Sequence, residues 1–431
     1  MAVRTRNPAD PPPRAVVDAV SYEDLYARWE RGNWSATELD FARDRDDWHE
    51  RLIPEQRRGA LWLYALFFHG EDSVTDNLSP YIDAAPREEQ KYFLATQQAD
   101  EARHSVFFKR FLHEVVGRGD GTVAGVLAAT RAELTWGHRQ VFTRLDRMAG
   151  ELRADRSRAT LAAAITLYHV VVEASLAQPG QHMIEDYLER YDVLPGFRAG
   201  MRHVALDEQR HIAFGVKLLA DLHREAPEEV TEAIVGVIRE VMPWTIAVAR
   251  PPNWDRSYTE SFGFTFEDLA EAGAASLEQR LRAIGLDVLH LPRFPMPMDI
   301  PARERALRGQ TLLRANLIGP GDGPVSQDPK AVAILFDTLA RQADARVVPA
   351  GTTIEWDLSD SEPWHIVLDG ERGAWAVSGR AARADARVRC RLADWADVAA
   401  GRADPRALVL RGRLRVRGRP RVLLALPRVL A

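Results

Sequence analysis

The sequence predicts a multi-domain protein in which an all-α helical bundle is followed by a smaller α+β domain. Three observations lead to this prediction. Apolar residues recur at helical spacing up to about residue 286. A stretch rich in proline and glycine then follows from residue 291 to about residue 328. Beyond it, apolar and polar residues alternate in short runs, which is typical of strands.

The helical part contains an apolar run that opens at Pro54. Leu61, Phe68 and Glu71 follow helical spacing within this run, so Glu71 falls on the apolar face. Further helices are expected over residues 86–117, 122–150, 159–191, 197–222, 227–249 and 266–284. A kink is expected at Pro179 in the third of these, because proline removes a helical hydrogen bond.

The second part reads as one helix followed by short strands. The helix is expected over residues 331–340, and the strands over residues 352–356, 364–368, 374–377 and 386–391. In the last strand, alternation places Val388 and Cys390 on one face and arginines on the other. The predicted division is a disordered tail at residues 1–20, a helical domain at 21–290, a linker at 291–328 and an α+β domain at 329–431.

Two five-residue strings in the helical part are nearly identical. They are DEARH at residues 100–104 and DEQRH at residues 207–211. An isolated glutamate in an apolar run precedes the glutamate of each string, by 30 and 35 residues respectively. Glu and His at positions i and i+3 project from the same face of a helix, so four such helices can form a two-metal site. The candidate ligands are Glu71, Glu101, His104, Glu173, Glu208 and His211.

The residue types in these strings suit a metal site and its support. Carboxylate oxygens and imidazole nitrogens are ligands that divalent cations of the first transition row accept. Asp100 and Asp207 each stand one residue before a candidate ligand, and we expect them to accept the second imidazole N–H across the pair. We expect Arg103 and Arg210 to hold these aspartates through charge-assisted hydrogen bonds.

The alternative is that these charged residues are solvated helix surface, which is the usual case for a single Glu-x-x-His string. Glu173 argues against it here, because this residue lies within the apolar run LYHVVVEASL at residues 167–176. A buried carboxylate without a partner costs several kcal/mol or takes up a proton. A metal ion is therefore the natural partner of this side chain.

With these strings, residues 20–290 resemble the ferritin-like di-metal carboxylate proteins. Within that class they are most similar to the ligand-binding oxidases related to the ribonucleotide reductase small subunit. The resemblance implies the same six ligands and a dioxygen-activating pair of metal ions. Mn/Fe is the pair it favours, and Fe/Fe is the alternative. It also implies a long-chain fatty acid or other lipid-like ligand in an adjoining apolar cavity.

Two further positions match the ligand-binding oxidases. That family forms an ether cross-link between a valine one turn after the first glutamate ligand and a tyrosine five residues before the third. Val74 and Tyr168 stand at these offsets from Glu71 and Glu173. The resemblance implies that they form the same cross-link, and the alternative is that both simply pack in the core.

A ribonucleotide reductase small subunit is the nearest alternative within this fold. Such subunits usually carry a radical tyrosine four residues after the first metal histidine, and Phe108 occupies that position here. They also need a flexible C-terminal peptide, whereas this linker leads into another domain. A generic di-iron monooxygenase, a ferroxidase and a lipid carrier with structural metal ions are further alternatives.

Residues 329–431 resemble a sterol carrier protein type-2 domain. The stretch DWADVAAGRADP at 394–405, followed by GRLRVRG at 412–418, has that family's order of short helix, glycine stop, Asp-Pro and strand. The resemblance implies a sheet covered by helices around an apolar tunnel for lipids. The arginine-rich run at 411–421 is typical of a charge-protected edge strand, with attraction to anionic lipid surfaces as the weaker alternative.

Composition limits the remaining possibilities. The net charge of −5 gives no reason to expect nucleic-acid binding, although residues 330–431 carry 18 basic and 12 acidic side chains and are basic on balance. A single cysteine, Cys390, excludes an intrachain disulfide. Together with the absence of an apolar signal segment at the N-terminus, this predicts a cytoplasmic protein. The apolar stretch at 161–177 is expected to be a buried helix and not a membrane span.

These features together predict a dioxygen-dependent di-metal oxidase that acts on a hydrophobic, fatty-acid or lipid-like substrate. The appended domain is expected to bind or deliver that substrate or a related lipid. Dioxygen and an unidentified electron donor are the other expected partners. A homodimer is expected because this fold often dimerises.

Overall fold

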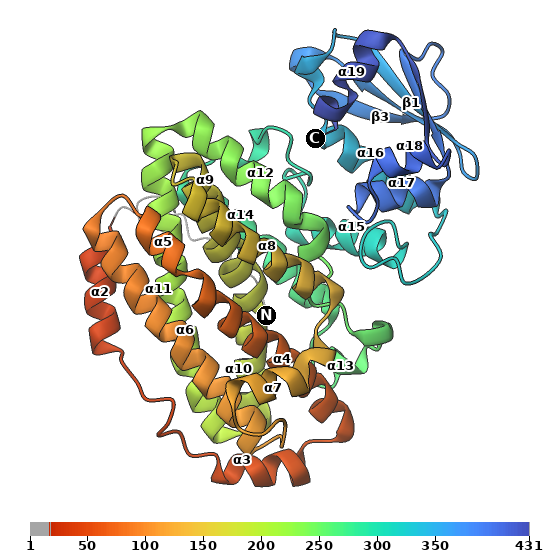
Figure 1. Ribbon diagram of the computed structural model, residues 1–431. Helices are drawn as coiled ribbons and strands as arrows, with labels where there is room; N and C mark the ends of the chain where they lie inside the picture. The colour runs from red at the N-terminus through yellow and green to blue at the C-terminus, as the bar shows by residue number, and fades with distance from the viewer. Residues whose placement is uncertain (1–16, 18, 431) are drawn as a thin grey trace. The chain divides into compact units, whose positions relative to one another are not determined.

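The computed structural model describes residue 17 and residues 19–430, which divide by their internal contacts into two compact units (Figure 1). Unit 1 extends to Ile238 and resumes over Ala249–His290. Unit 2 comprises Arg239–Val248 and the residues from Leu291 onward. The expected disordered tail at 1–20 lies almost entirely outside the described residues. The predicted fold class is confirmed, because unit 1 is helical and unit 2 contains a mixed sheet with helices.

Four long helical segments form the interior of unit 1. They are α4 (Pro54–Asn77), α6 (Glu88–Glu114), a third segment from Arg158 to Tyr191, and α11 (Pro195–Glu225). Proline stands in the first turn of both α4 and α11, where its missing N–H costs nothing. The other described α-helices of unit 1 are α2 (Tyr22–Arg31), α3 (Ala42–Asp46), α5 (Ser79–Ala84), α7 (Val123–Thr130), α8 (Trp136–Ala154), α12 (Pro227–Thr245), which extends into unit 2, α13 (Ser257–Glu260) and α14 (Phe266–Ile284).

The third segment changes its hydrogen-bonding pattern along its length. It consists of α9 (Arg158–Ile165), a π-helical stretch η3 (Thr166–Ala177) and α10 (Gln178–Tyr191). Pro179 lies in the first turn of α10, directly after the π-helical stretch, and the helix continues beyond it. The segment is long and apolar enough to span a membrane, but 72% of its most apolar window is buried in the protein. That burial is expected of a core helix.

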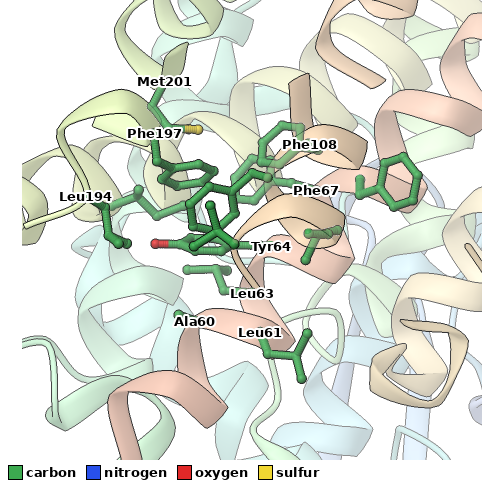
Figure 2. Close-up of a cluster of buried hydrophobic side chains, with 14 of the residues drawn as sticks. Ala60, Leu61, Leu63, Tyr64, Phe67, Phe108, Leu194, Phe197 and Met201 are labelled. Carbon is green, nitrogen blue, oxygen red and sulfur yellow. The ribbon is translucent and has the colours of Figure 1, made fainter. Parts of the chain in front are cut away.

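A cluster of aromatic side chains ties three of the segments together (Figure 2). The ring of Phe197 on α11 lies 4.3 Å from the ring of Tyr64 on α4 and 6.0 Å from that of Phe108 on α6. Phe67 stacks on Phe108 at 5.8 Å. Each ring that is removed from water contributes about 2–3 kcal/mol. This packing fixes the helix faces from which the polar residues of the interior project.

Gly215 allows α11 to approach η3 closely, since a Cβ atom there would lie 2.3 Å from Cβ of His169. We expect Gly215→Val to lower the free energy of unfolding by about 2–3 kcal/mol, because the two backbones must separate. Urea denaturation measures this change. Gly236→Ala on α12 is the control, because its Cβ would meet no described atom within 4 Å. It should raise stability by about 0.5–1 kcal/mol. Equal changes in the two variants would contradict the close approach.

Unit 2 contains a five-stranded sheet with the strand order β3-β2-β1-β4-β5. Strands β1 and β4 are parallel, and the other neighbours are antiparallel. The strands are β1 (Thr352–Leu358), β2 (Trp364–Leu368), β3 (Ala374–Ser378), β4 (Ala386–Cys390) and β5 (Arg415–Gly418). The helices outside the sheet are α15 (Ala302–Arg314), α16 (Pro329–Gln342), α17 (Leu392–Ala399), α18 (Pro405–Leu410) and α19 (Pro420–Val429).

One face of this sheet is buried against α16. Phe336 on that helix lies 5.6 Å from the ring of Trp356 and 5.2 Å from the ring of Trp364. The segment at residues 291–328, which we expected to be a linker, contains α15 and groups with unit 2. Its prolines and glycines therefore mark turns around a short helix.

Candidate metal centre

The six candidate ligands come from four helical segments and meet in the interior of unit 1. All are buried, with at most 6% of any of these residues exposed. α4 supplies Glu71, α6 supplies Glu101 and His104, η3 supplies Glu173, and α11 supplies Glu208 and His211.

The potential ligand atoms form two groups, and within each group all atoms lie within 4.8 Å of one another. The first group contains Glu71, Glu101, His104 and Glu208, and the second contains Glu101, Glu173 and His211. Glu101 belongs to both groups. The cluster could therefore bind two metal ions that share a carboxylate.

The two central carboxylates each face both imidazoles. Glu101 places Oε1 3.2 Å from Nδ1 of His211 and Oε2 3.4 Å from Nδ1 of His104. Glu208 places Oε1 3.7 Å from Nδ1 of His104 and Oε2 3.8 Å from Nδ1 of His211. Each of these two carboxylates therefore directs one oxygen toward each imidazole, so both would be placed to hold two metal ions.

Burial makes it unfavourable for the carboxylates of this cluster to be ionised when no cation is bound. It raises the pKa of Glu173 to about 8 and the pKa of Glu71 well above its ordinary value. Burial also opposes charge on the imidazoles, but the neighbouring carboxylates, Glu71 foremost, raise the pKa of His104 well above its ordinary value. The carboxylates thus depend on nearby positive charge to remain ionised.

Four buried atoms of these side chains have no hydrogen-bond partner among the described residues. They are Oε2 of Glu101, Oε2 of Glu173, Oε2 of Glu208 and Nδ1 of His211. Buried polar atoms are almost always paired, and a bound cation would give these four atoms a partner. Four carboxylates and two imidazoles fit a pair of iron or manganese ions.

Each imidazole is anchored by an aspartate from the opposite string. Asp100 Oδ2 lies 3.1 Å from Nε2 of His211, and Asp207 Oδ2 lies 3.1 Å from Nε2 of His104. With Nε2 held in this way, Nδ1 of each ring faces the carboxylates. Arg103 pairs with Asp100, while Arg210 pairs with both aspartates. All four predicted supporting residues therefore lie around the two imidazoles.

Two tryptophans that the sequence did not reveal complete this support. Trp29 Nε1 donates to Asp100 Oδ1 at 2.8 Å, and Trp34 Nε1 donates to Asp207 Oδ2 at 2.8 Å. Both precede the bundle helices in the chain, at and after the end of α2. An isolated tryptophan has no spacing relative to a distant aspartate, so no sequence signal points to these contacts.

Tyr168 lies at the same cluster. Its hydroxyl donates to Oε1 of Glu101 at 2.6 Å. Residues five apart are about one turn apart in a π-helix, so Tyr168 and Glu173 share one face of η3. The amide nitrogen of Gln97, which sequence reasoning missed, lies 3.0 Å from the Tyr168 hydroxyl and 2.9 Å from Oε1 of Glu173. Because Gln97 Oε1 faces His169 Nε2 at 3.1 Å, its amide nitrogen is directed toward the cluster.

Val74 is buried on α4, one turn after Glu71, with 5% of the residue exposed. Phe108, at the position that a radical tyrosine would occupy, belongs to the aromatic cluster of Figure 2 and has no polar group. Among the described residues, Tyr168 is therefore the tyrosine whose hydroxyl contacts a candidate ligand.

A helical bundle with this buried carboxylate–histidine cluster defines a ferritin-like protein that could bind two metal ions. Residues 17–247 match the family described as "Ribonucleotide reductase, small chain", and the chain belongs to this family. Residues 335–431 match the SCP-2 sterol transfer family. Both predicted resemblances are thereby confirmed.

Several similar solved structures are R2-like ligand-binding oxidases. One is the oxidase from Sulfolobus acidocaldarius, with a TM-score of 0.52 and 24% identity, which covers 62% of this chain and 92% of that chain. Two others are variants with an anaerobically reconstituted Mn/Fe cofactor, one valine-to-isoleucine and one tyrosine-to-phenylalanine. Each has a TM-score of 0.53 and 25% identity and covers 62% of this chain and 94% of that chain.

Proposed function

We propose that this protein is a dioxygen-dependent di-metal oxidase. The observation that carries the proposal is the convergence of six buried ligand side chains, four atoms of which have no hydrogen-bond partner among the described residues. Similar structures carry Mn/Fe cofactors, so we propose Mn/Fe as the metal pair, with Fe/Fe as the alternative. Bound by these ligands, the metal pair would supply the electrons that reduce dioxygen.

The chain's own residues would prepare this chemistry. One ion would be held by Glu71 and His104, and the other by Glu173 and His211. The two ions would share Glu101 and Glu208. Asp100 and Asp207 would keep each Nδ1 lone pair directed at the metal site by accepting a hydrogen bond from the Nε2–H group of the ring. Tyr168 would direct its hydroxyl proton to Glu101, while Gln97 holds the phenol oxygen in place.

We propose that oxidation joins Tyr168 to Val74 through an ether bond with loss of two hydrogens. The metal-free chain, loaded with Mn(II) and Fe(II) under air, should consume dioxygen and yield linked peptides lighter by two hydrogens, as measured by oxygen electrode and peptide mass spectrometry. Tyr168→Phe should retain two metal ions but form no adduct.

Each negative outcome points to a different alternative. Unlinked peptides with normal oxygen uptake would favour a generic di-iron oxygenase. A loaded protein that consumes no dioxygen would favour structural metal ions in a lipid carrier.

Stimulation of oxygen uptake by a long-chain fatty acid would support a lipid-like substrate, which we propose because the chain pairs an oxidase-like fold with an SCP-2 match. An unidentified electron donor, a homodimer and a cytoplasmic location stay predictions.

A further inference from the structure

The strand register of unit 2 shows which side chains share the face of the sheet opposite the buried one. One row across all five strands reads Val377, His365, Glu355, Arg387 and Arg417. The side chains of directly opposite residues project from the same face. The alternating residues, such as Trp356 and Val388, form the buried face.

Arginines lie directly opposite one another at one end of this row. Arg387 on β4 pairs in register with Arg417 on β5, and Arg389 pairs with Arg415. All four are exposed. Like charges at directly opposite positions destabilise a sheet, so this arrangement is not the product of strand pairing alone. One arginine per strand would suffice to protect an edge strand from further pairing.

Acidic neighbours neutralise only the inner arginines. Arg387 Nε lies 2.8 Å from Oε1 of Glu355, and Arg389 Nε lies 3.8 Å from Oδ2 of Asp357. Arg380 adds a further positive charge beside both acids, with Nη2 3.0 Å from Oδ1 of Asp357. No described acidic side chain forms an ion pair with Arg415 or Arg417, which therefore present free guanidinium groups on the outer strand.

The opposite end of the same face is apolar and exposed. Trp375 and Val377 on β3 are 43% and 37% exposed. Both register with residues of β2, Trp375 with Val367 and Val377 with His365, which places them on the arginine-bearing face. Tryptophan is enriched where protein meets the headgroup region of a bilayer, and guanidinium groups bind phosphates.

We propose that this face of the sheet docks on an anionic phospholipid surface. We call it the arginine–tryptophan face: Arg387, Arg389, Arg415, Arg417, Trp375 and Val377. Free positive charge at one edge matches lipid phosphates, and the exposed indole at the other edge matches the interfacial region. Docking would bring unit 2 to a membrane, independently of whether the metal centre of unit 1 is active.

The test is co-sedimentation of the full chain with vesicles. Phosphatidylcholine vesicles that contain phosphatidylglycerol should bind the chain, and pure phosphatidylcholine vesicles should bind it much less. The double variant Arg415→Gln/Arg417→Gln should bind about 30-fold more weakly, because each arginine contributes about 1 kcal/mol near an anionic surface. Binding should also weaken as salt is raised, and Arg415→Lys/Arg417→Lys should retain most of it.

The control variant is Arg406→Gln/Arg428→Gln, which removes two exposed arginines from α18 and α19 and changes the net charge equally. It should bind almost as the unaltered chain does. Equal losses in the two double variants would overturn the proposal, since net charge alone would then explain binding. Equal binding to both vesicle types would overturn it as well. So would tighter binding to a duplex oligonucleotide than to the anionic vesicles.

Discussion

Replacing Glu101 by glutamine should abolish binding of both metal ions, whereas Glu173→Gln should abolish only one. Glu101 faces Nδ1 of His104 with one oxygen and Nδ1 of His211 with the other, while Glu173 belongs only to the group around His211. Loss of a shared carboxylate should lower the affinity for both ions by more than about 100-fold, because even the loss of a residue that only supports a ligand lowers metal affinity by about 10–100-fold. Metal analysis after aerobic loading and dialysis measures the number of ions that each chain retains.

The matched control is the variant Glu88→Gln. Glu88 lies on the same helix, but its side chain is 65% exposed and is not expected to be a metal ligand. The variant should retain both ions. Metal-induced stabilisation gives a second measure, since a bound ligand raises the melting temperature by an amount that grows with the logarithm of its affinity at a fixed ligand concentration. A Glu101→Gln variant that still binds two ions with unchanged affinity would show that this carboxylate is not shared.

Replacing Asp207 by alanine should weaken the metal ion at His104 and destabilise the bundle. Asp207 accepts hydrogen bonds from His104 and Trp34 and pairs with Arg210, of which only 8% is exposed. Its removal frees the imidazole to rotate, which should lower affinity by about 10–100-fold. It also leaves a buried guanidinium with Asp100 as its remaining partner, at a cost of about 3 kcal/mol. Isothermal titration with Fe(II) and urea denaturation of the metal-free protein measure the two effects.

Asp207→Asn separates these two causes. An amide keeps the shape and can still accept from His104, but it cannot neutralise Arg210. This variant should therefore lose stability while retaining most of the metal affinity. If Asp207→Ala lost neither affinity nor stability, the aspartate would have no role in orienting the imidazole. Asp221→Ala is a control on the same helix, because that residue lies away from the cluster and pairs with Tyr22.

The repeated string made the ligand residues visible because helical geometry is local. Glu101 and His104 are three residues apart, so their shared face follows from the helix itself. Glu173 was visible because a charged residue stands out in an apolar run. Gln97 had neither signal, although its amide contacts both Tyr168 and Glu173, because a glutamine four residues before a ligand is ordinary in any helix.

The two folded parts, the helices with the candidate ligands and the face from which each ligand projects could all be predicted from the amino-acid sequence. These properties depend on apolar spacing and on residues close together in the chain. Two features became visible only in the folded chain. One is the π-helical geometry of η3, which places Tyr168 on the same face as Glu173, and the other is the contact of two tryptophans from outside the four long segments with the aspartates. Such contacts depend on how helices pack and rotate against one another, and that is set by the whole core and not by local spacing.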